Sequence, residues 1–247
     1  MNEVTMSMHA PAPAAPQTPN CSRCAVRDLC LPSGAEPGDA VRIDGLIGYR
    51  RRVARGETLF RRGQSFSMVY AVRFGHLKSF RPDHRGAPHI TAFSMAGDLM
   101  GLDAIGGGRH SCSAVALEDC EVCEIPYSRL QDALRESPSL MQRFHVALSH
   151  EIVREQESVL HADMGAAERL ASLLLNLSSR YAERGYSERR FHLRMSRADI
   201  GDYLGLTIES ISRLLTRFRE EGWISLDKRE VQLLHRDRLE ALLTAAP

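Results

Sequence analysis

The sequence predicts an α+β protein with an N-terminal β-roll, one long helix and a C-terminal winged helix-turn-helix. Between residues 53 and 126, short apolar runs alternate with glycine and proline turns, which is typical of an antiparallel roll or barrel. From Ser139 to Met164 neither glycine nor proline interrupts the chain, which indicates a long helix. Near the C-terminus, two short helical patterns joined by Gly205 precede two short strand patterns.

The composition is that of a globular protein with more than one module. With 43% hydrophobic and 26% charged residues, the 247-residue chain can bury a sizeable core. The net charge of +1 gives no overall signal for a polyanionic partner, so a nucleic-acid surface has to come from local clusters of arginine. No stretch resembles a secretory signal or a membrane span, and we expect a cytoplasmic protein without a membrane partner.

We expect five segments along the chain. Residues 1–20 form a disordered tail, because this alanine- and proline-rich stretch has too few large apolar side chains to fold. Residues 21–34 form a cysteine-rich loop, 35–137 the β-roll sensor, 138–164 the long helix, and 165–247 the DNA-binding module. Four strands are predicted within the roll: Met68–Val72, Leu77–Phe80, His89–Phe93 and Val122–Ile125.

The long helix carries a seam of apolar residues close to a 3,4 repeat, which is typical of a helix that pairs with a second copy. The seam residues are Met141, Phe144, Leu148, Ile152, Val159 and Ala162. Glu155 falls in register with them. In a dimer, two Glu155 carboxylates would repel each other by roughly 1 to 4 kcal/mol at a few ångströms, so dimerisation would be marginal. Alternatively, Glu155 lies beside the seam and pairs with Arg154 or another arginine.

The C-terminal module carries local signals for its helix ends. Ser196 followed by Asp199 forms a capping box, and the helix that it begins ends at Gly205. Thr207 caps the next helix, which ends at Gly222. A charged turn then joins two short strands that would form the wing. These strands are Trp223–Leu226 and Val231–Leu234.

The second of these helices has a polar face suited to DNA. Its buried face is predicted to comprise Ile208, Ile211, Leu214, Leu215 and Phe218. The other face carries Glu209, Ser212 and Arg213, where glutamate can accept from cytosine N4 and arginine can bind guanine O6 and N7. Arg217 and Arg219 are better placed for phosphates. Alternatively, Glu209 and Arg213 form only an ion pair on a solvated face.

Three of the six cysteines are clustered as Cys21-x2-Cys24-x5-Cys30. Thiolates in such a loop suit zinc or an iron–sulfur cluster, and the spacing favours neither. A fourth thiolate from the β-roll would complete the set. Cys120 and Cys123 have opposite parity on a predicted strand, so their side chains are expected to point to different faces. We interpret Cys112 and Cys120 as small buried side chains.

Five stretches carry a family resemblance: Ala96–Leu99, Gly101–Gly106, Val122–Pro126, Asp199–Thr207 and Glu209–Arg213. They resemble the cyclic-AMP receptor protein (CRP) superfamily and, within it, the oxygen-responsive fumarate and nitrate reduction regulator (FNR) family. The match covers nearly the whole chain after the tail. It implies a cyclic-nucleotide-binding-like roll, a dimerisation helix and a winged helix whose Glu209, Ser212 and Arg213 contact a palindrome similar to TTGAT and ATCAA separated by four bases. It also implies a homodimer whose roll surface touches RNA polymerase.

The same resemblance implies an oxygen-labile [4Fe-4S] cluster held by Cys21, Cys24, Cys30 and Cys123, with Leu29 beside it as an apolar shield. The family has an inhibitory aspartate where this chain has Glu155, so the resemblance implies a cluster-controlled dimer switch there. The helix residues that we place around this switch are Leu148, Ile152 and Val159. The expected protein is an oxygen-sensing transcription regulator that controls anaerobic gene expression.

Other functions are weighed against this one. The main alternative is a regulator of the same superfamily that binds zinc or a small-molecule effector instead of a cluster. A cyclic nucleotide is disfavoured because residues 107–111, Gly-Gly-Arg-His-Ser, replace the phosphate-binding Arg-Ser pair of the superfamily. None of the ten histidines has the motif context of a haem ligand. We expect no enzyme, since Gly106–Gly108 lacks the lysine and hydroxyl residue of a phosphate-binding loop.

Overall fold

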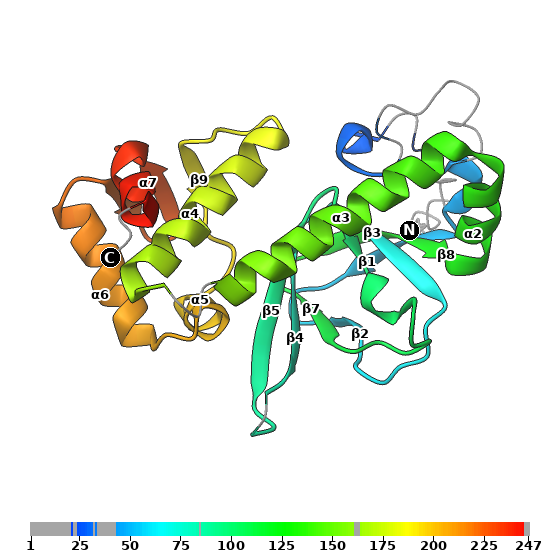
Figure 1. Ribbon diagram of the computed structural model, residues 1–247, viewed down its shortest axis with the longest axis horizontal. Coiled ribbons are helices and arrows are strands. Elements are labelled where there is room, and N and C mark those ends of the chain that lie inside the picture. Colours follow the sequence, from blue (N-terminus) through cyan, green and yellow to red (C-terminus); the bar gives the residue numbers. More distant parts are fainter. Residues whose placement is uncertain are drawn as a thin grey trace, which may run out of the picture.

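The computed structural model describes residues 21, 24–31, 33, 43–83, 85–160 and 164–244, without the side chains of residues 155 and 157–160. The expected tail, residues 1–20, lies outside the described residues. A β-roll and a helical C-terminal domain lie at opposite ends of the molecule, and the long helix α3 (Pro138–Leu160) runs between them (Figure 1). This is the α+β order that the sequence predicts.

The roll consists of two four-stranded antiparallel sheets, with the orders β1-β8-β3-β6 and β2-β7-β4-β5. Their strands are β1 (Tyr49–Val53), β2 (Thr58–Phe60), β3 (Met68–Phe74), β4 (His76–Pro82), β5 (Pro88–Met95), β6 (Leu99–Met100), β7 (Ser113–Ala116) and β8 (Cys120–Pro126). Apolar side chains from both sheets meet between them, among them Phe60, Leu77 and Val122. The four predicted strands are confirmed as β3, β4, β5 and β8, each longer by up to two residues at either end.

Helices and the cysteine loop cover the outer face of the first sheet. Leu130 and Leu134 of α2 (Tyr127–Glu136) join Leu140 and Phe144 of α3 and Ile125 of β8 in one core cluster. The sequence analysis missed α2 as a helix separate from α3. It was also wrong to place Phe144 in a dimer seam, because the first half of α3 lies on the roll and buries this ring there.

The C-terminal domain combines helices with a three-stranded antiparallel sheet in the order β10-β11-β9. Its elements are α4 (Ala166–Glu183), β9 (Arg190–His192), α5 (Arg197–Leu204), α6 (Ile208–Glu220), β10 (Ile224–Asp227), β11 (Glu230–Leu233) and α7 (Arg236–Thr244). The predicted capping box is confirmed, since Ser196 Oγ accepts from the Asp199 amide (3.0 Å) and the Asp199 carboxylate accepts from the Ser196 amide (2.9 Å). The predicted stop at Gly205 is also confirmed, with a φ of +64°.

The C-terminal domain packs against the roll of its own chain. Ile90, Phe93 and Met95 of β5 lie in the same core cluster as Leu204 of α5 and Phe218 of α6. No sequence pattern predicts this contact between the two modules. None of the helices in the described part of the chain has both the length and the apolar character needed to cross a membrane.

Candidate nucleic-acid interface and cysteine site

The helix α6 is anchored by its N-terminal cap and one apolar face. Thr207 Oγ1 accepts from the Ser210 amide (3.1 Å), which satisfies a backbone donor of the first turn. Ile211, Leu215 and Phe218 are buried, as predicted. Ile208 is 49% exposed, so its predicted burial is wrong. It lies in the first turn, about 60° around the helix from Ile211, at the edge of the buried stripe.

The opposite face of α6 presents the three side chains expected to contact bases. Glu209 and Arg213 are exposed and Ser212 is half-buried. Arg213 Nη2 donates to Ser210 Oγ (3.4 Å), and Arg197 Nη1 of α5 donates to Ser212 Oγ (3.0 Å). Within the described residues no ion-pair contact joins Glu209 to Arg213, but the charge of Arg213 contributes to the lowered pKa of Glu209, so the alternative of an intrahelical pair stays open.

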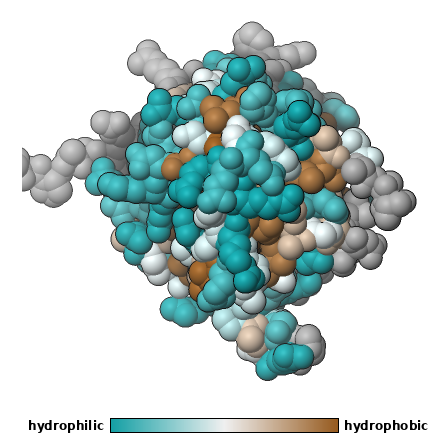
Figure 2. Space-filling model, turned by 90° about the vertical axis from the view of Figure 1, so that its left-hand side faces the viewer, coloured by the Kyte–Doolittle hydropathy of each residue, from teal (hydrophilic) through white to brown (hydrophobic). Residues whose placement is uncertain are grey.

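The charge on this face suits a nucleic acid. The backbone amide of Glu209 and the Thr207 hydroxyl hold the pKa of the Glu209 carboxyl below its usual value, so it is ionised and can accept from a base. Arg217 pairs with Glu221 (2.7 Å) at the surface, a contact weak enough to exchange for a phosphate. Figure 2 looks onto this end of the molecule and shows a mainly hydrophilic surface. Basic residues exposed in the C-terminal domain include Arg189, Arg190, Arg194, Arg197, Arg213, Arg217, Arg219, Lys228 and Arg229.

The four cysteines singled out for a cofactor line one pocket. Cys21, Cys24 and Cys30 belong to the loop around η1 (Arg27–Leu29), and Cys123 comes from the outer face of β8. The free volume between these side chains is about 30 Å³, roughly that of one water molecule. Its other walls are mainly apolar and include Val26, Leu31, Ile43, Leu46, Ile47, Ala71, Val72 and Ile125. The packing of the loop on the sheet thus brings Cys123 close to three cysteines that lie about a hundred residues before it in the sequence.

Cys21 and Cys123 are buried, Cys24 and Cys30 are half-buried, and the thiols act on one another electrostatically. Burial, followed by the nearness of Cys123, raises the pKa of Cys21 to about 12. Burial likewise raises the pKa of Cys30 to about 12, and burial raises that of Cys123. Four thiolates could therefore be accommodated together only with a compensating cation. Among the described residues, no three His, Cys, Asp or Glu side chains form a group that could hold a single metal ion, so the thiols surround a pocket instead of meeting at one point.

The other two cysteines occupy different surroundings. Cys120 is buried between the two sheets, whereas Cys123 lies in the cluster on the outer face, which confirms the difference expected from strand parity. Cys120 Sγ donates to the carbonyl oxygens of Glu118 (3.1 Å) and His76 (3.3 Å). Cys112 is only half-buried, with its thiol 3.6 Å from Asp103, so the expectation of a buried side chain is wrong for it.

In the roll segment where the superfamily would bind a nucleotide, His110 and Ser111 contact other side chains of the chain. His110, 3% exposed, stacks on Phe60 with ring centroids 4.0 Å apart. The Asp103 carboxylate, in the short helix η2 (Leu102–Ala104), accepts from the amide (2.6 Å) and hydroxyl (2.9 Å) of Ser111. A carboxylate that caps this loop would repel a phosphate, which disfavours a cyclic nucleotide.

Three apolar side chains of α3 are exposed. Val146, Ile152 and Val153 are exposed by 44%, 58% and 46%, whereas Leu148 is half-buried against the roll. Arg154 pairs with Glu151 and Asp98. The side chains of residues 155 and 159, which belong to the expected dimer switch, lie outside the described residues.

Sequence analysis missed the polar contacts that hold the C-terminal domain on the roll. Lys78 Nζ of β4 donates to Asp199 (2.5 Å), and the Ile90 amide of β5 donates to Asp202 (2.6 Å). Both partners are on α5, and they lie more than a hundred residues from the groups that they bind. Asp199 was expected only as a helix cap, and no local pattern signals its second role.

A winged helix-turn-helix with an exposed polar helix, carried on a β-roll, defines a DNA-binding transcription regulator. A Crp-like helix-turn-helix domain model matches residues 168–242, and a cyclic nucleotide-binding domain model matches residues 50–137. Transcriptional regulatory protein btr of Bordetella pertussis is 42% identical over 237 residues, 96% of this chain and 98% of the relative. The fumarate and nitrate reduction regulatory protein of Escherichia coli is 40% identical over 224 residues, 90% of each chain.

Solved structures agree with these relatives. The structure of FixK2 from Bradyrhizobium japonicum superposes with a TM-score of 0.73 at 29% identity, over 80% of this chain and 98% of that chain. The chain therefore belongs to the CRP/FNR family of transcription regulators, and fumarate and nitrate reduction regulatory proteins are among its relatives at 40 to 41% identity. It is a DNA-binding regulator and not an enzyme.

Proposed function

We propose that this protein is an oxygen-sensing transcription regulator whose Cys21, Cys24, Cys30 and Cys123 hold a [4Fe-4S] cluster. The observation that carries the proposal is the pocket in which these four thiols gather. The approximately 40% identity to fumarate and nitrate reduction regulatory proteins supports it further. Through the bound cluster, dimerisation and binding to a palindromic DNA site become dependent on oxygen.

The donor set and the walls of the pocket fit an iron–sulfur cluster. Thiolates are the usual ligands of such clusters, and apolar walls limit the access of water to them. When bound, the cluster supplies a centre that oxygen can attack, which gives the protein its signal. Arg50 lies near Cys123 and limits the rise in the pKa of that thiol. Arg73 lies near Cys24, which helps to raise the pKa of the Arg73 guanidinium. These two cations would offset part of the negative charge of a tetrathiolate site.

We further propose that the protein acts as a homodimer that pairs through α3. Ile152 is 58% exposed and lies on the same helix face as Leu148, so a second copy would cover it. Val146 and Val153 lie about 100 to 120° around the helix from Ile152 and line the cleft beside the cysteine loop. Leu148 and Val159 would border this contact, and Glu155 would weaken it by repulsion between the two copies. Two α6 helices would then enter successive major grooves of a palindrome, and the roll surface would be free to touch RNA polymerase.

On the DNA, the side chains of α6 divide into two roles. Glu209, Ser212 and Arg213 would contact base edges, because they lie together on the exposed face near the N-terminal end. Arg217, which now pairs with Glu221, would bind a phosphate. The reading of bases and the binding of phosphates then differ in their dependence on sequence and on salt.

The proposal is tested by purifying the full chain without oxygen. Iron, acid-labile sulfide, zinc and the visible spectrum are measured before and after air is admitted. About four iron and four sulfide per chain, with absorbance that bleaches in air, would support the cluster. Zinc without a visible band would contradict it and favour the zinc-binding alternative. Binding of cyclic AMP in a calorimetric titration would favour a small-molecule effector instead.

A further inference from the structure

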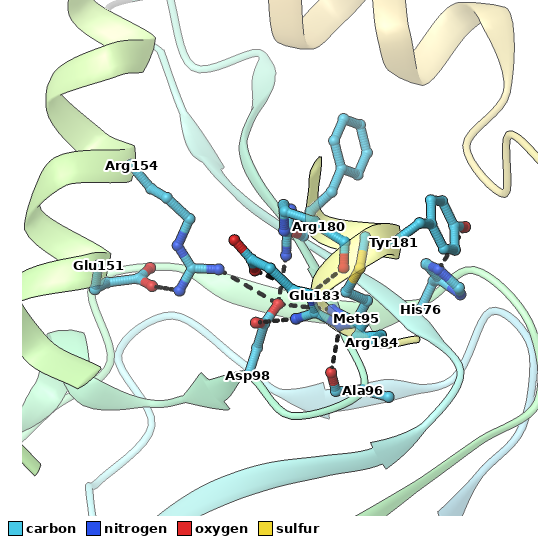
Figure 3. A network of polar contacts seen from close by, with 11 residues as sticks. His76, Met95, Ala96, Asp98, Glu151, Arg154, Arg180, Tyr181, Glu183 and Arg184 are labelled. Atoms are coloured by element: carbon cyan, nitrogen blue, oxygen red, sulfur yellow. Dashed lines mark hydrogen bonds and ion pairs between the residues drawn. The ribbon is translucent and has the colours of Figure 1, made fainter. Parts of the chain in front are cut away.

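Asp98 is a hub where three parts of the protein meet (Figure 3). It lies in the turn that leads from β5 to β6, and its side chain is only 10% exposed. One carboxylate oxygen accepts from Arg184 (2.8 Å). The other accepts from Arg180 (2.5 Å) and lies 3.3 Å from Arg154. Three guanidinium groups therefore share one buried carboxylate.

The three arginines come from outside the roll. Arg154 belongs to α3, two residues after the exposed Ile152, and Arg180 and Arg184 belong to α4 of the C-terminal domain. Both α4 arginines also bind backbone carbonyl oxygens of the roll: Arg180 reaches Phe93 O (3.0 Å) and Arg184 reaches Ala96 O (2.7 Å). The Asp98 turn thus fastens the C-terminal domain and the long helix to the sensor at one place.

The same turn touches the cysteine loop. Gly97 precedes Asp98 with a φ of +94°, and a Cβ atom on it would lie 2.7 Å from Leu29 Cβ. Leu29 is the residue before Cys30. An open cleft between the loop, the turn, α3 and α4 is lined by Leu29 and Cys30 on one side and by Asp98, Arg154, Arg180 and Arg184 on the other. A change in the position of the cysteine loop therefore acts directly on the residue next to Asp98.

We propose that the Asp98 turn is the joint through which the state of the cysteine loop sets the docking of the DNA-binding domain. The docked arrangement is the form that binds DNA, because α6 is fixed in orientation while its base-contacting face stays open. The idea rests on the proposed function only for the nature of the signal at the cysteines. The docking itself can be tested without any cofactor.

The charge balance makes Asp98 the decisive element of the joint. Burial alone would raise the pKa of its carboxyl, but Arg180, Arg154 and Arg184 outweigh burial and hold the pKa below its usual value. In Asp98→Asn the side chain keeps its shape and can still accept from the Met95 amide (2.8 Å), so the turn itself is preserved. Arg180 would then lose the carboxylate that it binds, and Arg154 and Arg184 would keep only Glu151 and Glu183, so the guanidinium groups would repel one another and the C-terminal domain would leave the roll.

Hydrogen exchange of β5 measures docking, because the Ile90 amide donates to Asp202 of α5 only in the docked arrangement. Asp98→Asn is expected to raise the exchange rate of the β5 segment by about ten- to a hundredfold, the equivalent of losing one charged hydrogen bond. Exchange of β3 should not change. The matched control is Asp132→Asn, which removes the same charge from an exposed pair with Arg135 on α2. Equal β5 exchange in Asp98→Asn and wild type would overturn the proposal.

The link to the cysteine loop is tested by two further comparisons. Gly97→Ala places a Cβ atom 2.7 Å from Leu29 Cβ, which forces the turn and the cysteine loop apart, so it should raise β5 exchange. The control Gly63→Ala adds the same carbon at a φ of +79° in open space and should leave β5 exchange unchanged. In wild-type protein prepared without oxygen, admission of air should raise β5 exchange; in Asp98→Asn, exchange should be high before and after. Unchanged exchange in Gly97→Ala would refute the relay. If air does not change β5 exchange in the wild type while Asp98→Asn is still undocked, the cysteine loop does not carry the oxygen signal. The role of Asp98 in docking would then still hold.

Discussion

Gly201 of α5 lies against the turn that leads to the recognition helix α6. This turn approaches the helix so closely that a larger residue is expected not to fit at position 201. A Cβ atom at this position would lie 2.6 Å from the carbonyl oxygen of Leu206. The two residues are already joined, since the Leu206 amide donates to Gly201 O (2.8 Å). The clashing atom belongs to the backbone, so it cannot move aside as the end of a flexible side chain could. We therefore expect Gly201→Ala to displace α6 relative to α5.

The size of the effect follows from two opposing terms. Replacing glycine by alanine inside a helix stabilises it by about 0.5 to 1 kcal/mol through backbone entropy. Forcing one carbon into a packed site costs about 1 to 3 kcal/mol. The net expectation is a loss of about 1 to 2 kcal/mol in the free energy of unfolding of the C-terminal domain, which lowers the midpoint in urea by about 0.5 to 1 M. Affinity for a specific DNA duplex should fall as well, because α6 is displaced.

The single tryptophan of the chain provides the assay. Trp223 stacks on Phe218 of α6, with ring centroids 5.2 Å apart, so its fluorescence reports unfolding of this domain alone. The control is Gly222→Ala, which adds the same carbon in open space at a φ of +72°. It should cost about 1 to 2 kcal/mol through its backbone conformation but leave DNA affinity close to that of wild type. A urea midpoint for Gly201→Ala at or above that of wild type would refute the reasoning.

Three other expectations follow from the site and the hub. Arg213→Ala should weaken binding to a specific duplex by about 1 to 3 kcal/mol without changing its salt dependence. Arg219→Ala should weaken binding to DNA of any sequence and lower the slope of affinity against salt concentration by about 1. Fluorescence anisotropy at several salt concentrations distinguishes the two. Identical behaviour of the two variants would argue against base contact by Arg213. Cys123→Ser should lose the visible absorbance and bound iron of protein prepared without oxygen, while Cys120→Ser, whose thiol lies between the sheets, should keep both. Equal loss in the two would reject Cys123 as the ligand. Because the pKa of Asp98 is lowered in the folded protein, its contribution to docking is complete above the usual Asp value of about 3.9 and is lost only as pH falls below that value. Exchange of the β5 amides, corrected for intrinsic rates, should therefore show constant docking from pH 8 to 5. Undocking within that range would contradict this expectation.

The parts of the fold that local chemistry determines could be predicted closely. A serine hydroxyl that caps its helix and a glycine with positive φ act within a few residues, so Ser196, Gly205 and Thr207 mark the helix ends as predicted. Strand positions in the roll followed from the spacing of turns. The apolar pattern of α6 was correct except at Ile208, because a periodic pattern does not say where the neighbouring elements end.

The cysteine pocket could be predicted only in part. Parity separated Cys120 from Cys123, because alternate residues of a strand point to opposite faces whatever the rest of the fold does. Which face the cysteine loop would cover depends on the packing of α2 and α3 on the roll, and the sequence gives no periodic signal for that. The choice of Cys123 as the fourth ligand therefore came from family resemblance, and its place in the same pocket as Cys21 is a property of the folded chain.

The contacts between the domains had no sequence signal at all. Lys78 and Asp199 are 121 residues apart, and each has an unremarkable local role: Lys78 lies on a strand and Asp199 caps a helix. A charged side chain that serves a distant partner looks the same in sequence as one that faces water. Only the relative placement of the roll and α5 reveals that the capping residue also holds the domain in place.

The contact at the Asp98 turn is made of charged groups, and this composition suits a contact that forms and breaks reversibly. A buried ion pair contributes less to stability than apolar packing of similar volume, because its groups must first be removed from water. The docking surface already has an apolar part, where Ile90 and Phe93 pack against the C-terminal domain, and that part would hold in either state. Three cations around one carboxylate behave differently: a small shift of Asp98 changes an attraction into a repulsion. A contact that is sensitive to the position of a single side chain suits a switch better than a scaffold, and Gly97 brings that side chain within reach of the cysteine loop.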